Sequence, residues 1–173
     1  GVNSKLTVDF PDDCSQPNVL FIVYDISSTS YNQVVFDAIS TNRSILQYYN
    51  NTLRLKSLSD NVVQYSIDVP TPFLINTLVY NSPDSKLYEF ALLKSQGDSG
   101  SLGFDGFCVG TTQDDQAFFG GDIAEIIFYN GNLSSEAILN VQDYLYTKYF
   151  NYPPVNLSYD IRVPYGFCDT SIT

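Results

Sequence analysis

Apolar and polar residues alternate through most of the chain, and this period of two predicts β-strands. Turn-forming residues separate the strands at short, regular intervals, as at residues 50–51, 59–61 and 81–84. Short strands with such turns are typical of antiparallel sheets that pack face to face as a sandwich. We expect strands at residues 5–10, 19–26, 33–39, 44–49, 52–58, 62–69, 73–80, 86–94, 103–110 and 122–129.

The last third of the chain departs from this pattern. Residues 122–129 are rich in Ile and aromatic side chains, and both faces of this predicted strand are apolar. This indicates an interior strand that is covered on both sides. After a break at Asn130-Gly131, Ile138, Val141 and Leu145 follow at three- and four-residue steps and form one apolar stripe. The chain therefore predicts one substantial helix, over residues 135–149.

The residues at both ends of this predicted helix agree with it. Ser134 is a good N-cap, and Glu136 and Lys148 have the charges that the helix dipole favours at its first and last turns. Pro153 and Pro154 stop the helix. We therefore expect a domain over residues 1–150 and an extended tail or linker over residues 151–173.

The segment Gly121-Asp-Ile-Ala-Glu-Ile-Ile-Phe-Tyr-Asn130, with the helix that follows it, resembles the closing strand and helix of laminin-G-like domains. These domains belong to the concanavalin A-like lectin and glucanase superfamily. Residues 86–100 resemble the hairpin that usually carries an Asn-Gly turn, with Glu89-Phe90 in its place, and residues 102–110 resemble the next strand. The resemblance covers about residues 17–150. It implies an all-β fold, a two-sheet antiparallel jelly-roll sandwich (concanavalin A-like) with one C-terminal helix.

The charge of the chain makes several classes of anionic binding partner unfavourable. Nineteen acidic residues against eight basic ones give a net charge of −11, with a pI near 4.1. A chain this acidic is a poor ligand for nucleic acid, for anionic membrane surfaces and for heparin-like polymers. The longest apolar run, residues 19–24, is far too short to cross a membrane, so no membrane insertion is expected. The acidity serves either solubility or cation binding in loops.

Three cysteines give an odd count. Cys14 and Cys168 lie in polar, loop-like surroundings, and we expect a disulfide between them that ties the tail to the first loop. Cys108 lies inside a predicted strand and is expected to be a buried thiol. The odd count also allows a link to another chain.

Four sequons, at Asn42, Asn50, Asn132 and Asn156, fall at predicted turns or in the tail, where a glycan can be tolerated. Unmodified loop asparagines are the alternative. The chain contains no Met, which indicates a mature product or a piece of something longer. Together with the disulfide, these features predict an extracellular or secreted protein, or one on a particle surface.

Catalysis is not expected from the residue types present. The chain has no His, which removes the commonest general base and serine triads. Glycoside hydrolysis needs two carboxylates that face one sugar, about 5–5.5 Å apart for retention. Asp122 and Glu125 are three residues apart and should lie on opposite faces of their strand. The other predicted strand carboxylates are each alone in their strand, so no catalytic residue is assigned.

Binding at loops is the better expectation. The candidate loops are residues 27–32, 95–101 and 111–116, with Tyr31, Asn32, Asp114 and Asp115 as candidate ligand-binding residues. No cofactor is required, but the oxygens of Asp114 and Asp115 make Ca²⁺ the candidate ion, unless these acids are simply solvated. Tyr31, Phe118 and Phe119 would stack on a sugar or belong to the core.

Two classes of function therefore stay open. The first is a non-catalytic extracellular adhesion module, or a lectin-like module that binds a glycan or an extracellular protein. The second is a structural subunit of a filament, sheath or virion surface, which would bind copies of itself or neighbouring domains through its tail or a sheet edge. The resemblance does not choose between them, because the superfamily contains lectins, adhesion modules, enzymes and structural domains.

Overall fold

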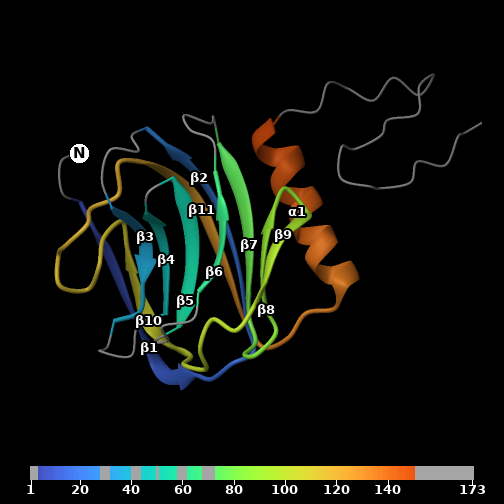
Figure 1. Cartoon of the computed structure of the whole chain (residues 1–173), viewed down its shortest axis with the longest axis horizontal. Helices are drawn as coiled ribbons and strands as arrows, with labels where there is room; N and C mark the ends of the chain where they lie inside the picture. The colour runs from blue at the N-terminus through green and yellow to red at the C-terminus, as the bar shows by residue number, and fades with distance from the viewer. Residues whose placement is uncertain are drawn as a thin grey trace, which may run out of the picture.

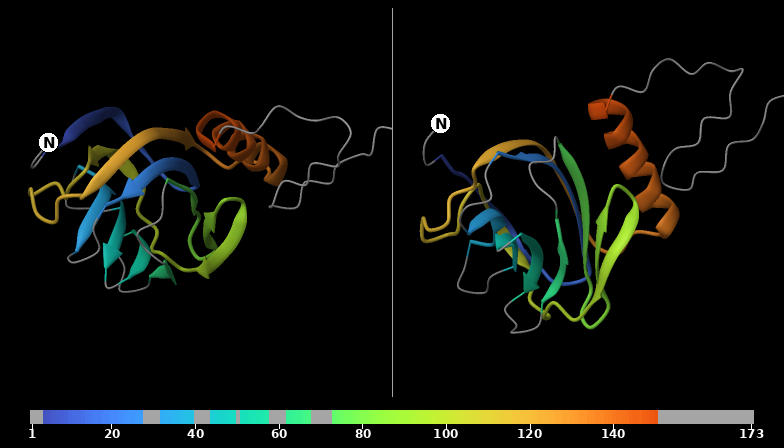
Figure 2. Two further views of the ribbon diagram at one scale, coloured as in Figure 1. Left: turned by 90° about the horizontal axis from the view of Figure 1, so that it is seen from above. Right: turned by 45° about the horizontal axis from the view of Figure 1, so that its top comes forward.

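The computed structural model describes residues 4–27, 32–39, 44–49, 51–57, 62–67 and 73–150. Two antiparallel sheets pack face to face, and one helix lies outside the second sheet (Figures 1 and 2). The six-stranded sheet has the order β1 (Leu6–Cys14), β10 (Phe104–Val109), β3 (Gln33–Asp37), β4 (Ser44–Tyr49), β5 (Thr52–Ser57) and β6 (Val63–Ser66). The five-stranded sheet has the order β11 (Gly121–Asn130), β2 (Asn18–Ile26), β7 (Leu74–Tyr80), β8 (Ser85–Glu89) and β9 (Leu92–Gly97). The predicted fold class is confirmed.

The main core lies between the two sheets. Strand β2 shows how it forms: Leu20, Ile22 and Tyr24 point into the sandwich, while Val19 and Phe21 point toward the helix. All five are fully buried, because β2 is a central strand that is covered on both faces. Near β1 and β10 the core is aromatic, and its rings pack mostly edge to face at centroid distances of 5.0–6.2 Å, among them Phe10, Phe36, Tyr80, Phe104, Phe107 and Phe128.

Helix α1 (Ser135–Phe150) begins and packs as the sequence predicts. The hydroxyl of Ser134 accepts a hydrogen bond from the amide of Ala137 at 3.1 Å, which confirms the N-cap. Ile138 and Leu145 are buried against the outer face of the five-stranded sheet, and Val141 is partly buried beside them. Gln142 extends this contact, because its amide nitrogen donates to the Thr77 hydroxyl at 2.7 Å. Within the described residues, no helix is long and apolar enough to span a membrane.

The hairpin between β8 and β9 corrects the expectation of one strand over residues 86–94. The chain turns at Phe90 and Ala91, which both have positive φ, 45° and 65°. Two-residue hairpins need this left-handed backbone, and Asn-Gly usually supplies it. Phe90 is held there by packing: its ring contacts Tyr146 and Phe150 of α1 edge to face, and its amide donates to the Ile75 carbonyl.

The expectation of an interior strand over residues 122–129 is wrong in one respect. Among the strands that the structure describes, β11 lies at the edge of the five-stranded sheet and pairs with β2 alone. Its two faces are apolar because Ile126 and Phe128 enter the main core while Ile127 packs in the cluster under α1. Helix α1 thus covers the outer face of β11. This is why β11, an edge strand, has the apolar pattern that is typical of a central strand. The predicted tail, residues 151–173, lies outside the described residues.

Candidate functional site

A hollow of about 360 Å³ opens at one end of the sandwich, between the end of β1 and the start of β10. It forms because the two strands lose their regular pairing there: Asp9 pairs with Gly106, but the next pair is Cys14 with Phe104. The β1 side covers residues 9–14 while the β10 side covers only residues 104–106, so β1 bulges away from its partner. Phe10 fills the sandwich side of the bulge and packs on Phe107 and Phe128.

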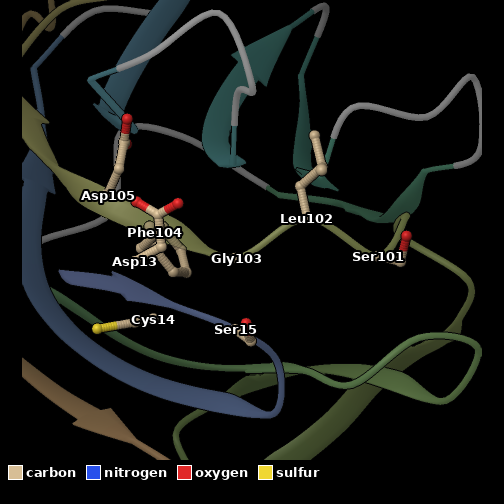
Figure 3. A pocket seen from close by; sticks show the side chains of 8 residues that line it. All are labelled: Asp13, Cys14, Ser15, Ser101, Leu102, Gly103, Phe104 and Asp105. Atoms are coloured by element: carbon tan, nitrogen blue, oxygen red, sulfur yellow. The ribbon is translucent and has the colours of Figure 1, made fainter.

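The lining of the hollow is mixed: Leu102 and Phe104 contribute apolar surface beside acidic and hydroxyl groups. Figure 3 shows Asp13 and Asp105 on one side and Ser101 on the other, with Ser15 below. Carboxylates only accept hydrogen bonds, whereas serine hydroxyls both donate and accept. One oxygen of Asp105 already accepts from the amide of Ile39, which fixes this carboxylate at the wall. The hollow therefore offers a set of hydrogen-bonding groups that suits a ligand with several hydroxyls.

The loop that forms one wall of the hollow is held in place by partly buried hydrogen bonds. The side-chain amide of Gln16 donates to the carbonyls of Gly100 and Leu102 at 2.9 and 2.6 Å, and its oxygen accepts from the amide of Ser82. Asp98 accepts from the Gly100 amide and from the Ser82 hydroxyl, both at 2.8 Å. These bonds link residues 98–102 to both neighbouring turns, so the wall is formed before any ligand arrives.

Gly103 lets β1 and the loop come together at the bottom of the hollow. A Cβ atom on Gly103 would lie 2.0 Å from the carbonyl oxygen of Cys14, which no side chain can tolerate. The close approach of two backbones here requires glycine.

Cys14 lines the hollow without being activated. Burial, followed by the nearby charges of Asp13 and Asp12, raises the pKa of this thiol, so it stays protonated at neutral pH. It is a free thiol in the structure, and its predicted partner, Cys168, lies outside the described residues, so the disulfide stays a prediction. Cys108 is a buried thiol, as expected, and burial also raises its pKa.

The predicted binding loop lies at the opposite end of the sandwich. Residues 111–116 form a tight turn in which the hydroxyls of Thr111 and Thr112 donate to the Gln116 carbonyl at 2.6 and 2.7 Å. This turn directs Asp114 and Asp115 into solvent, and Asp115 forms an ion pair with Lys5. Hydrogen bonding to Asp115 raises the pKa of Lys5.

The other candidate residues are distributed as follows. Asn32 is exposed just before β3. The loop at residues 111–116 ends close to it, since the Val34 amide donates to the carbonyl of Ala117, the residue that follows this loop. Tyr31 lies outside the described residues. Phe119 packs against the core beside Tyr24, which favours its structural role. Among the described residues no group of three or more His, Cys, Asp or Glu has the arrangement of a metal site, so Ca²⁺ binding by Asp114 and Asp115 stays a prediction.

The carboxylates of β11 are arranged differently from the expectation. Asp122 pairs with Asp25, and Glu125 pairs with Val23, because Ala124 is an extra residue in a bulge. Asp122 and Glu125 therefore lie on the same face, toward α1, and the prediction of opposite faces is wrong. Asp25 is across from Asp122 on this face, and Glu125 forms an ion pair with Lys148 of α1 at 3.0 Å. Carboxylates of β11 and β2 thus lie side by side on one face. The spacing of acids within a single strand does not reveal such a pair.

A second polar group lies between the sheets. The Tyr65 hydroxyl donates to Glu89 at 2.7 Å and accepts from Asn76, which also accepts from the Tyr24 hydroxyl. Burial raises the pKa of both tyrosines, so neither provides a phenolate at neutral pH. Lys94 pairs with Glu89 at 3.1 Å. These contacts form a structural network across the sandwich.

Of the four sequon asparagines, only Asn132 is among the described residues, where it is exposed between β11 and α1. Asn42, Asn50 and Asn156 lie outside them. The position of Asn132 is open to a glycan, and modification stays a prediction at all four sites.

No family model matches this sequence, and no curated protein matches it. Solved structures do share its fold. A protein from Bacteroides ovatus described as a putative carbohydrate binding protein is 13% identical, with a TM-score of 0.62 over 78% of this chain. That match covers 43% of the Bacteroides chain, so this chain spans less than half of its length.

Two further matches belong to sialidases. The carbohydrate-binding module CBM40 of the Ruminococcus gnavus IT-sialidase, bound to α2,3-sialyllactose, is 13% identical with a TM-score of 0.57, and the match covers 82% of this chain and 100% of the module. The Trypanosoma rangeli sialidase is 12% identical with a TM-score of 0.60, over 77% of this chain and 23% of the enzyme. At these identities the likeness shows the fold alone: a two-sheet antiparallel β-sandwich.

Few features of the sequence point to the hollow. Asp13 was visible only as part of an acidic stretch before Cys14, and Asp105 as one acid in a strand. The available signal was the Pro11-Asp12-Asp13 run directly after a predicted strand, which is typical of a bulge or loop rather than of regular pairing.

Proposed function

We propose that this chain is a non-catalytic, glycan-binding module of an extracellular protein. The observation that carries the proposal is the preformed hollow between β1 and β10, on a sandwich whose structural relatives include carbohydrate-binding modules. Asp13 and Asp105 would accept hydrogen bonds from sugar hydroxyls, and Ser15 and Ser101 would complete the set. We also propose that the chain is related to laminin-G-like domains and that it takes part in adhesion.

A glycan array followed by calorimetry tests the proposal. We expect the chain to bind at least one oligosaccharide, and Asp13→Asn to weaken that binding about tenfold, because a charge-assisted hydrogen bond becomes a neutral one. Asp84→Asn is the matched control, since Asp84 is an exposed acid in the turn between β7 and β8. Binding that Asp13→Asn leaves unchanged would exclude the hollow as the site.

Binding without hydrolysis is the second part of the proposal. The carboxylates that share a face, Asp25, Asp122 and Glu125, lie at the far end of β2 from the hollow, and Glu125 is paired with Lys148. A ligand in the hollow therefore does not reach them. We expect no cleavage of any oligosaccharide that binds, as followed by mass spectrometry. Cleavage that is lost in Asp122→Asn would show that this face is catalytic.

A structural assembly subunit is the alternative, and the sheet edges favour it. Edge strand β1 exposes Leu6 (62%) and Val8 (45%), and edge strand β9 exposes Leu92 (48%) and Leu93 (51%). Unprotected apolar edge strands are sites where another chain can add a strand. Light scattering on the purified protein separates the two functions: a monomer supports the binding module, and a filament or large particle supports the assembly subunit.

A further inference from the structure

The outer face of the six-stranded sheet carries a row of polar side chains on β4, β5 and β6. Arg54 lies between Leu53 and Leu55, which are fully buried in the core, so Arg54 points outward. The strand register places Gln47 on one side of Arg54 and Gln64 on the other. A second row on the same face contains Tyr49, Thr52 and Ser66.

Two neighbours hold the Arg54 side chain in place. Its Nε donates to the Gln64 side-chain oxygen at 3.1 Å, and its guanidinium carbon lies 4.1 Å from the centre of the Tyr49 ring. These contacts use Nε and the flat face of the guanidinium. Neither contact uses the hydrogens of the two terminal nitrogens, which are the donors that match a carboxylate.

The charge around Arg54 is unusual for this chain. The ion pairs of the described residues join Lys5 to Asp115, Lys94 to Glu89 and Lys148 to Glu125, and no described carboxylate pairs with Arg54. Within the described part of the chain, Arg54 is thus a half-buried, immobilised cation that no carboxylate pairs with, and it can bind an acid from outside.

We propose that Arg54, with Gln47, Gln64 and Tyr49, forms a second binding site, which takes the carboxylate of an acidic saccharide. The planar guanidinium binds a carboxylate through two parallel hydrogen bonds, and an orientation fixed in advance reduces the entropy that binding costs. The two glutamine amides donate and accept, as the hydroxyls of the sugar ring require. The choice of a saccharide as the carrier of the carboxylate rests on the proposed function.

This site is separate from the hollow. Strands β3 and β4 lie between β10 and β5, so three strand spacings, about 14 Å, separate the two places across the sheet. The net charge of −11 repels acidic ligands at long range. Binding of an acidic saccharide therefore depends on the local donors of Arg54, which makes the site sensitive to one substitution.

Calorimetry with three probes on the full chain tests this site: 3′-sialyllactose, trigalacturonic acid and neutral lactose. We expect one of the acidic probes to bind at least tenfold more tightly than lactose, and its identity distinguishes a sialic acid from a uronic acid. Arg54→Gln should weaken that binding about tenfold to a hundredfold, the usual effect of losing hydrogen bonds to a charged group. Arg54→Lys should weaken it less, because it keeps the charge but loses the planar fork.

Two further variants complete the test, with folding checked by circular dichroism. Lys86→Gln removes the same charge from the other sheet and should leave the affinity unchanged. A loss of affinity for the acidic probe in Asp13→Asn that equals the loss in Arg54→Gln would place the acidic ligand in the hollow and overturn the second site. Equal affinity of Arg54→Gln and the parent chain, or no preference for either acidic probe over lactose, would overturn it too. Neutral glycans bound in the hollow would still support the proposed function in those cases.

Discussion

At the scale of single residues, the hollow depends on side chains that the sequence shows but cannot place. Asp13 and Asp105 are far apart in the chain and meet because β1 and β10 pair around a bulge. The residue types, acidic and hydroxyl-bearing, were visible in the sequence. Their meeting was not, because a bulge shifts every later residue of a strand relative to its partner. The same effect at Ala124 reversed the predicted faces of Asp122 and Glu125.

Gly103 offers a test at this scale. Gly103→Ala places a methyl group where the Cys14 carbonyl oxygen lies, and forcing the backbones apart should destabilise the protein by about 1–3 kcal/mol. Urea unfolding measures the loss. Gly97→Ala is the control, because a Cβ there meets only the Val63 side chain at 3.8 Å and should change stability by less than about 0.5 kcal/mol. Equal effects of the two substitutions would show that the close approach does not exist.

At the scale of helices and strands, prediction succeeded where a single spacing of apolar residues runs through the whole element. The helix was found because its apolar stripe, N-cap and terminal charges all agree. Alternation alone predicts one strand through the β8–β9 hairpin, because no Asn-Gly marks its turn; the resemblance to laminin-G-like domains placed the turn at Glu89-Phe90, one residue before its position at Phe90 and Ala91. The left-handed backbone at Phe90 is imposed by packing against Tyr146 and Phe150, a tertiary effect that local sequence does not contain.

The stripe of α1 predicts the effect of truncating it. Leu145 is fully buried under the helix, so Leu145→Ala should lower the free energy of unfolding by about 2–5 kcal/mol. Asn140→Ala on the exposed face of the helix should change it by less than about 0.5 kcal/mol. Thermal or urea denaturation gives both values, and a loss below about 0.5 kcal/mol for Leu145→Ala would mean that the helix does not pack through this face.

The β8–β9 turn predicts two substitutions of opposite sign. Ala91→Gly relieves a left-handed backbone that disfavours a side chain, and it should stabilise the protein by about 0.5–1 kcal/mol. Phe90→Gly relieves the same backbone but removes the ring that contacts α1, so it should destabilise the protein. Denaturation midpoints compare the two, and stabilisation by Phe90→Gly would show that the aromatic contact contributes nothing.

At the scale of the whole molecule, the two apolar periods, two residues in the strands and three to four in the helix, were enough to predict two packed sheets and one helix. It could not locate the binding site, because strand order and bulges decide which loops and edges meet. The candidate loop at residues 111–116 and the hollow lie at opposite ends of the sandwich, and only the fold distinguishes them.

The proposal that the protein is secreted can be tested separately. We expect a disulfide between Cys14 and Cys168 and a glycan on at least one of Asn42, Asn50, Asn132 and Asn156. In the chain-entropy model, closing so long a loop stabilises the fold by roughly 4–5 kcal/mol. Intact mass with and without reduction measures both features in protein from its natural source. A mass equal to the bare sequence, with three thiols that react with an alkylating reagent after denaturation, would contradict this proposal.

Amide chemical shifts, followed during titration with the oligosaccharide that an array selects, show whether the hollow between β1 and β10 binds a glycan. We expect the largest shifts to fall on residues 13–15 and 101–105, which line the hollow, and to need about tenfold more oligosaccharide in Asp13→Asn. Shifts confined to residues 111–116, to β9 or to α1, with the hollow unaffected, would contradict glycan binding in the hollow.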